Sequence, residues 1–331
     1  MSGSESGAIA LDVTKANPLK ENADASFQGS QKIGAFDIDG DLAHEWLKLP
    51  NPHGKPNRDV LKPSWNGIDV TRRSRDIWIV DFGLTMNQQD AALYEAPFRH
   101  IVEHVKPERE QNPRAIRAKN WWRHGDGQPK MRAAIAPLKR YIATPDVAKH
   151  RPFVWVDQAV LPDKMLIVIA RDDDTTFGIV SSRIHVARAL ALGSSLEDRP
   201  RYNPTQFFQT FPFPKPNTKT EIAAAAKRLN QLRQNWLNPP RWVDVVPEVV
   251  AGYPDRIIPK PEYAKAIKVR KLTNLYNLKL KGEVQWLEDL HRTLDVAAAR
   301  AYGWDDYTPA MSDEEILPRL LKLNLERAAR Q

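Results

Sequence analysis

The stretch FPFPKP at residues 211–216 divides the sequence into two parts with different hydrophobic periodicity. Before it, apolar and β-branched residues form short runs bounded by turn-forming residues, which is typical of strands. After it, apolar residues recur at spacings of three and four, which is typical of amphipathic helices. Proline cannot continue a helix or a central strand, so three prolines in six residues indicate a boundary. We therefore expect an α+β fold with a mixed sheet up to residue 216, followed by an all-α domain over 217–331.

The first part contains four runs of strand length, at residues 77–82, 153–156, 165–170 and 177–180. Helical patterns lie between the first two runs, over 88–105, 108–123 and 131–142. Residues 49–66 carry four prolines and a glycine, and we expect an ordered surface loop there, with a turn at Asn66-Gly67. Residues 1–30 are polar and lack periodicity, which predicts a flexible tail or linker. The α+β domain therefore covers 31–216.

The second part carries two sequence signatures of helix starts. Thr218 and Glu221 have capping-box spacing before a helix expected to reach about Leu237, and Ser312 and Glu315 repeat the device before an apolar pattern. Between them, one stripe at helical spacing should be buried, formed by Leu287, Leu290, Leu294, Ala297 and Ala301.

Composition narrows the class of protein. The 331 residues are 42% hydrophobic and 27% charged, which are ordinary globular values. The chain has no cysteine, so it has no disulfide or thiolate zinc site, and this fits a reducing cytoplasm. The N-terminus lacks the pattern of a secretory signal, and the longest apolar stretch, residues 165–170, is too short to span a bilayer. We expect a soluble, cytoplasmic protein without a membrane partner.

The net charge of +8 is concentrated in one segment. Thirteen Lys and Arg stand against five Asp and Glu between residues 99 and 151, and aromatic residues are interleaved with them. This combination suits a polyanion with stacked bases, such as DNA. A solvated helical face that serves solubility is the alternative. Trp121 and Trp122 are expected in the core rather than as stacking platforms for bases.

The sequence AFDIDGDLAH at residues 35–44 contains the Asp-x-Asp-Gly pattern of aspartyl-phosphate phosphatases. In that reading Asp37 would be the nucleophile of a stand-alone enzyme. The preceding residues are polar and interrupted by glycine, which makes a poor strand, and Asp41 adds a third negative charge where the phosphatases have a hydroxyl residue. This assignment stays a minor alternative.

Three further motifs have ordinary structural explanations. Asn238-Pro-Pro-Arg241 is similar to the Asn-Pro-Pro-aromatic element of amino-methyltransferases, but arginine replaces the aromatic residue and the motif follows a helix, which it would end. Asp172 to Asp174 could bind Mg²⁺, or form a solvated turn between two strands. His100 and His104 lie four residues apart, without a third zinc ligand in view. We predict no catalytic residues, metal site or cofactor site in this chain.

Several long blocks carry a family resemblance. Residues 51–73, 81–110, 121–125, 140–155, 167–185 and 201–214 resemble the target-recognition region of MmeI-like adenine-specific DNA methyltransferases, which are large fused restriction-modification enzymes. Residues 272–277, 286–304 and 317–328 resemble the C-terminal helical segment of the same family. In that family a Phe-Asp-Ile element, here residues 36–38, follows SFQGS just past the methyltransferase core, so the resemblance implies a domain start there.

The family places its adenosylmethionine-binding glycine motif, its catalytic Asn-Pro-Pro-aromatic element and its nuclease residues before this region, and none occurs here. The resemblance therefore implies a DNA recognition part without its own catalytic site. Its expected partners are double-stranded DNA and a methyltransferase domain or subunit, with a nuclease as a further one. S-adenosylmethionine would be bound by that catalytic partner, and the activity of the whole would be site-specific adenine methylation.

A recognition module needs phosphate contacts for position and base-edge contacts for sequence. Arginine pairs with guanine, and Asp or Glu accepts from the cytosine amine. We expect phosphate contacts from basic loops and clusters, namely Lys55, Asn57, Arg58, Arg72, Arg73, Arg75, Lys149, His150 and Arg151. We expect base contacts in and around the loop that follows residue 185, from Arg183, His185, Ser194, Glu197, Asp198, Arg199, Arg201 and Tyr202. A second choice for the same role is Arg171, Asp172 and Asp173.

The predicted function is sequence-specific DNA binding that presents adenine to a catalytic partner, either as a split specificity subunit or as the remnant of a broken gene. The alternatives are a nonspecific nucleic-acid-binding or scaffold protein, and the Asp37-dependent phosphatase. A nonspecific binder would show a steep salt dependence without sequence preference.

Overall fold

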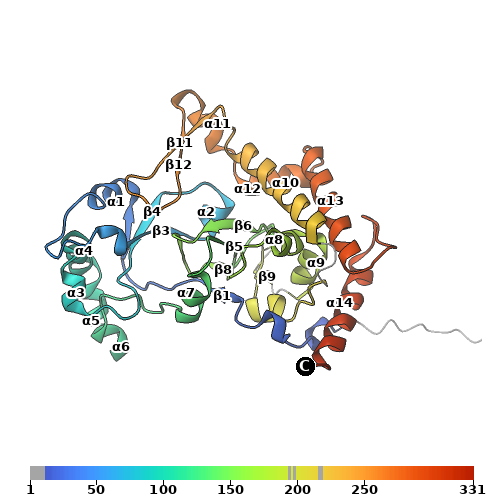
Figure 1. Ribbon diagram of the computed structural model, residues 1–331, viewed down its shortest axis with the longest axis horizontal. Helices are drawn as coiled ribbons and strands as arrows, with labels where there is room; N and C mark the ends of the chain where they lie inside the picture. The colour runs from blue at the N-terminus through green and yellow to red at the C-terminus, as the bar shows by residue number, and fades with distance from the viewer. Residues whose placement is uncertain (1–11, 193–194, 197–198, 215–218) are drawn as a thin grey trace, which may run out of the picture.

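Two four-stranded sheets form the first part of the chain, and long helices flank the second sheet (Figure 1). The computed structural model describes residues 12–192, 195–196, 199–214 and 219–331. The α+β fold class with helices toward the C-terminus is therefore confirmed. No helix in the described ranges is both long and apolar enough to cross a bilayer.

The first sheet is mixed. Its strand order is β2 (Asp37–Asp39), β4 (Ile77–Val80), β3 (Leu61–Trp65) and β7 (Leu161–Pro162), and only the β3–β7 pair is parallel. It packs with α1 (Gly40–Trp46), α3 (Gln88–Ala92) and α4 (Glu95–His104) around its own hydrophobic cluster, which contains Phe36, Trp78 and Phe82. Trp121 and Trp122 belong to this cluster, as expected.

The second sheet is antiparallel, in the order β1 (Ser26–Gln28), β8 (Leu166–Ile169), β5 (Arg140–Pro145) and β6 (Val154–Asp157). All four residues of β8 are buried, which explains its unbroken apolar run. β1 comes from the segment that we expected to be a tail. Ser26 to Gln28 pair with β8, and Leu19 is buried, so the latter half of residues 1–30 is part of the folded unit.

The C-terminal helices share a core with the second sheet. α10 (Lys219–Leu237) packs on α8 (Asp174–Ser181) and on α13 (Gln285–Ala301), and Gly178 allows the close approach, because a Cβ there would lie 2.6 Å from Ile222 Cγ2. The apolar stripe of α13 faces this core, and the capping box of Ser312 and Glu315 starts α14 (Asp313–Ala328), both as expected. A boundary at residue 216 remains a prediction from the sequence.

The hairpin of β11 (Val243–Val246) and β12 (Arg256–Pro259) was not expected within the helical part. It follows α10 and reaches the first sheet, where Val249, Val250 and Tyr253 pack on its hydrophobic cluster. The chain then returns through α11 (Ala264–Lys268) and α12 (Leu272–Leu280) (Figure 1).

Four further sequence-based assignments were wrong or too coarse. Residues 177–180 form part of α8 instead of a strand, because Asp173 caps a helix there and its side chain accepts from the Thr176 N–H. The pattern at 131–142 divides into α7 (Pro129–Ile135) and strand β5, with Pro137 between them. The pattern at 88–105 is two helices, α3 and α4. The pattern at 108–123 likewise divides, into α5 (Lys106–Glu110) and α6 (Ala115–Lys119).

Candidate nucleic-acid interface

Four segments that are distant in sequence meet at one surface. They are the end of α2 (Gly67–Thr71), the loop of residues 146–151 after β5, the chain at residue 201 after β10 (Arg199–Pro200), and α12. The Thr273 hydroxyl donates to the Thr71 carbonyl at 3.0 Å, and His150 Nε2 lies 2.9 Å from Asn277 Oδ1. Residues 147 and 201 form a β-bridge. We call the cations and polar groups presented there, Arg72, Lys149, His150 and Arg201, the basic face.

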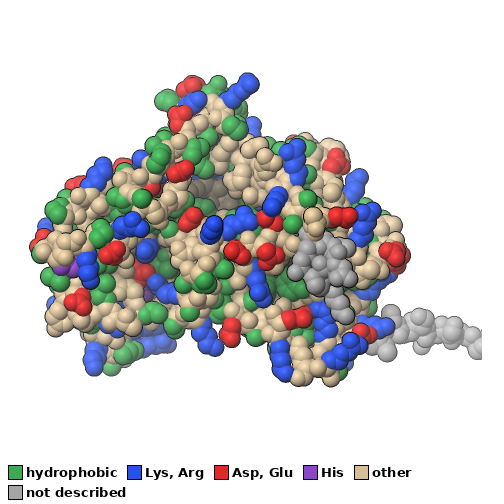
Figure 2. Space-filling model, viewed as in Figure 1, with side chains coloured by type: hydrophobic (Ala, Val, Ile, Leu, Met, Phe, Trp, Pro, Cys, Tyr) green, Lys and Arg blue, Asp and Glu red, His purple; other side chains and the backbone are tan. Residues whose placement is uncertain are grey.

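The cations of the basic face are accessible. Arg72 and Lys149 are exposed, and the Arg201 side chain is 61% exposed. Arg201 lies 3.4 Å from the carboxylate of Asp146, whose pKa is raised by burial, although Arg201 and Arg151 oppose that rise. Only the guanidinium end of this ion pair is exposed, since the Asp146 side chain is 6% exposed, so Arg201 can turn from Asp146 toward a ligand. Figure 2 shows Lys and Arg side chains, interspersed with acidic ones, across the middle of the molecule.

Arg151 does not belong to this accessible set. It is buried, and its guanidinium donates to Thr144 Oγ1 and to the carbonyls of Pro145 and Pro200. Burial lowers its pKa to about 10, so it still carries its charge at neutral pH. The expectation of a phosphate contact is corrected for Arg151. It instead ties β5 to β10.

His185 and Tyr202 are likewise corrected, because both are 1% exposed. His185 lies on α9 (Arg183–Leu192), and its Nε2 is 2.9 Å from the Tyr202 hydroxyl. Burial lowers the pKa of His185 to about 3, with Arg188 and Arg151 adding to the effect, so the ring is neutral at pH 7. These groups form a buried anchor beneath the loop and cannot reach a base edge.

Asn57 is also corrected. Its side chain is fully buried, donates to the Trp46 carbonyl at 2.8 Å and accepts from Asn51, so it orders the proline-rich loop. Lys55 and Arg58 are exposed on that loop, beside the first sheet. The Tyr253 hydroxyl of the β11–β12 connection donates to the Arg58 carbonyl.

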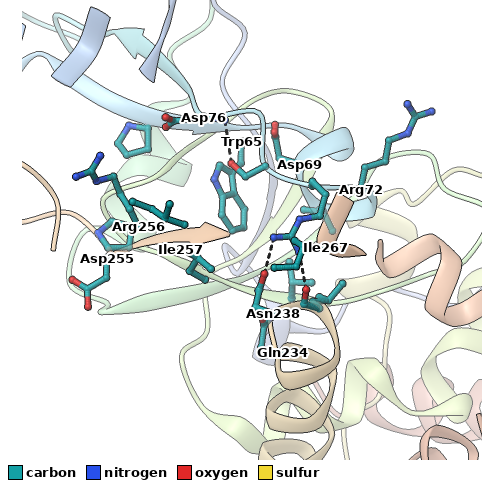
Figure 3. Close-up of a pocket in the computed structure, with 18 of the residues that line it drawn as sticks. Trp65, Asp69, Arg72, Asp76, Gln234, Asn238, Asp255, Arg256, Ile257 and Ile267 are labelled. Atoms are coloured by element: carbon teal, nitrogen blue, oxygen red, sulfur yellow. Dashed lines mark hydrogen bonds between the residues drawn. The ribbon is translucent and has the colours of Figure 1, made fainter. Parts of the chain in front are cut away.

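The arginines after α2 are held by partners. Arg73 donates to the carbonyl of Leu237 and, at 2.7 Å, to Asn238 Oδ1, which links α2 to the end of α10 (Figure 3). Arg75 makes a two-pronged contact with Asp69. Asn238-Pro-Pro-Arg241 therefore acts as a helix end with a structural amide, as the sequence suggested.

The second-choice residues lie at the start of α8. Asp173 is the helix cap, the Asp172 carbonyl accepts from Arg140, and Arg171 donates to the Glu21 carbonyl. Arg183 is bound to the C-terminal part, where it contacts the Pro309 carbonyl and Asp313. The structure does not bring these residues to the basic face. Ser194, Glu197 and Asp198 lie outside the described residues, and Arg199 is described only as part of β10.

A cleft of about 540 Å³ adjoins the basic face, between α2, β3, α10, β12 and α11 (Figure 3). Its lining mixes Trp65 and Ile257 with charged groups of both signs. Arg72 stands at its edge and extends away from it in Figure 3. The sequence did not suggest this cleft, because the unexpected hairpin forms one wall. The contributions of Thr273 and Asn277 were also missed, and the only signal for them was the family resemblance of residues 272–277.

Asp37 and Asp39 have structural roles. Asp37 lies in β2 and forms an ion pair with Lys32, and Asp39 caps α1 by accepting from the Leu42 N–H. The motif AFDIDGDLAH is therefore a short strand followed directly by a capped helix.

Comparison with known proteins relates the first part of the chain to a DNA target recognition domain. Residues 75–215 match the family model described as the MmeI target recognition domain. Among solved structures, the chain is similar to the Type IIL restriction-modification enzyme MmeI in complex with DNA, with 17% sequence identity and a TM-score of 0.66. That match covers 97% of this chain and 37% of the MmeI chain. No curated protein matches.

Proposed function

We propose that this chain supplies the sequence-specific DNA recognition of an MmeI-like restriction-modification system. It would present target duplexes to a methyltransferase domain or subunit that holds S-adenosylmethionine and modifies adenine. A nuclease would be a further partner, and a cytoplasmic location is part of the same proposal. The observation that carries it is the match of residues 75–215 to the MmeI target recognition domain model, because this segment contains most of the basic face.

Within this function, some residues of the basic face would fix the position of the duplex and others would read its base sequence. Arg72 and Lys149 are exposed cations suited to phosphate oxygens, which fix the register of the duplex. Arg201 follows the β9 (Ser195–Leu196) and β10 hairpin, and a guanidinium there can donate two hydrogen bonds to guanine in the major groove. Arg151 would support Arg201 from beneath the basic face. By donating to the Pro200 carbonyl it holds the hairpin base, which reduces the ordering cost of binding.

The test is selection of duplexes from a randomised library by the purified chain, followed by binding measurements. We expect an enriched short site that binds more tightly than its scrambled version. Arg201→Gln should reduce this preference by about 5- to 150-fold, which corresponds to the loss of one base contact worth about 1–3 kcal/mol. Arg228→Gln, an exposed cation on α10, is the matched control and should leave the preference intact.

If no site is enriched and all duplexes bind equally tightly, the result would instead indicate a nonspecific nucleic-acid-binding protein. The catalytic part of the proposal has a separate test. Methylation of adenine in the selected duplex should require addition of the methyltransferase partner and S-adenosylmethionine.

A further inference from the structure

We propose that residues 112–119, which contain α6, form a second DNA contact outside the basic face, with Ile116 packed into the minor groove and cations on flanking phosphates. This inference rests on the proposed function, and we call the segment the α6 tip. It lies at the lower left end of the molecule in Figure 1, well separated from α2 and α12.

The charge of this segment is one-sided. No acidic residue occurs from residue 111 to residue 125, whereas the same stretch contains Arg114, Arg117, Lys119 and Arg123. Arg123 is used internally, because its guanidinium donates to the carbonyls of Thr85 and Met86. The other three cations lie on the α6 tip, where Arg114 and Lys119 are exposed. Duplex DNA, with one charge per ~1.7 Å of its axis, is the complementary polyanion.

Ile116 is unusual in this setting because it is 65% exposed. At about 100° per residue, it points between Arg117 and Lys119 on the single turn of α6. An apolar side chain between two cations matches minor-groove binding proteins, which place Ile, Leu or Met against the bases while Arg and Lys contact phosphates. Figure 2 shows Lys and Arg side chains beside apolar ones at this corner of the molecule.

A buried arginine anchors the chain at the end of the α6 tip. Arg109 is 1% exposed, and its guanidinium donates to the carbonyls of Arg117, Asn120 and Arg123 on one side and of Lys32 and Ile33 on the other. Burial lowers the pKa of Arg109, and the nearby Arg117 adds to this effect while Glu108 opposes it. The bond to the Arg117 carbonyl holds the end of the α6 tip, and the bonds to Asn120 and Arg123 hold the chain that follows it, which lowers the entropic cost of binding.

An anionic membrane is the competing partner for a cationic segment with an exposed apolar residue. Interfacial membrane helices bury a whole apolar face, whereas α6 has one turn and a single large apolar side chain. DNA therefore fits the α6 tip better, because a groove receives one wedge and its two walls carry the phosphates.

The experiment compares the full-length chain with a triple variant, Arg114→Ser, Arg117→Ser and Lys119→Ser. Loss of about three phosphate contacts should reduce the slope of log affinity against log salt by about two to three, equally for the selected and the scrambled duplex. The preference between the two duplexes should stay unchanged. Ile116→Ala should weaken both by about tenfold without changing the salt slope.

The matched control removes three exposed cations from the opposite end of the molecule, with Arg228→Ser, Lys322→Ser and Arg330→Ser. The substituted α6 side chains donate none of the bonds made by Arg109, so the fold should persist, which circular dichroism can check. A triple variant that behaves like the control would overturn the inference. The inference would also be overturned if binding to phosphatidylserine vesicles depended on these cations while binding to the duplex did not. An unchanged salt slope together with an intact site preference refutes the α6 contact and leaves the proposed function standing.

Discussion

Two neighbouring layers of the molecule, the basic face and the buried anchor beneath it, are built from nearby residues of the same segments. Lys149 is exposed and Arg151 is buried, while Arg201 is exposed and Tyr202 is buried. Arg201 and Tyr202 are adjacent in extended chain, where successive side chains point to opposite sides, whereas Lys149 and Arg151 belong to the loop after β5. The comparison teaches that a charged residue near a recognition surface has one of two roles, contact or support, and that these roles predict different experimental results.

Removing the anchor should have the largest effect. Arg151→Met leaves the carbonyls of Pro145 and Pro200 without their donor, and each buried unpaired group costs about 1–3 kcal/mol. We expect the free energy of unfolding to fall by about 3 kcal/mol in urea titrations. Lys149→Met, two residues earlier, should change it by less than about 0.5 kcal/mol. Equal losses of unfolding free energy in the two variants would contradict the distinction between the basic face and the buried anchor.

The anchor should also make stability depend on pH. His185 has a pKa of about 3 in the folded protein against about 6.5 when unfolded, so the unfolded chain binds the extra proton between these values. Its contribution is present above pH 6.5 and is lost as the pH falls, with a slope of at most about 1.4 kcal/mol per pH unit. His185→Phe should flatten the dependence of unfolding free energy on pH between 6 and 4.

Asp295 opposes this trend and provides an internal check. Burial raises its pKa to about 6, so the folded protein holds a proton that the unfolded chain releases, and stability falls as the pH rises from about 4 to 6. Asp295→Asn should therefore make the unfolding free energy fall more steeply as the pH is lowered, because the opposing contribution of Asp295 is gone. A flatter profile in this variant would contradict the assignment of both groups.

A smaller effect is expected at the start of α8, where a single residue, Asp173, can be tested for a supporting or a contacting role. Asp173→Ala removes a helix cap and should cost about 1 kcal/mol of stability, read as a lower urea midpoint. Because Asp173 supports the helix and lies away from the basic face, duplex affinity and site preference should not change. A lost preference would return Asp173 to the set of base-reading residues.

The sequence predicted those parts of the fold in which local pattern and tertiary environment agree. The strands near residues 77–82, 153–156 and 165–170 and the capped helix α14 are of this kind. The run at 177–180 failed because a short apolar segment suits a buried helix as well as a strand. The polar strand β1 was missed, because its structure comes from pairing with β8 and not from its own composition.

The sequence led to a candidate region for DNA contacts, but it did not separate the accessible residues of that region from the buried ones. Charge identified the segments that contribute cations, yet Arg151 and Asn57 are buried among carbonyl groups, and nothing in their local sequence distinguishes them from Lys149 or Lys55. Burial depends on contacts between distant segments, such as Thr273 with Thr71, which no local pattern contains.

The most direct test of the account compares two double variants on the ratio of affinities for the selected and the scrambled duplex. Arg199→Gln with Arg201→Gln should collapse that ratio, while Arg72→Ser with Lys149→Ser should preserve it and reduce the salt slope by about two. A ratio that survives the first pair, or collapses with the second, would contradict the claim that the chain after β9 reads sequence and that Arg72 and Lys149 set position.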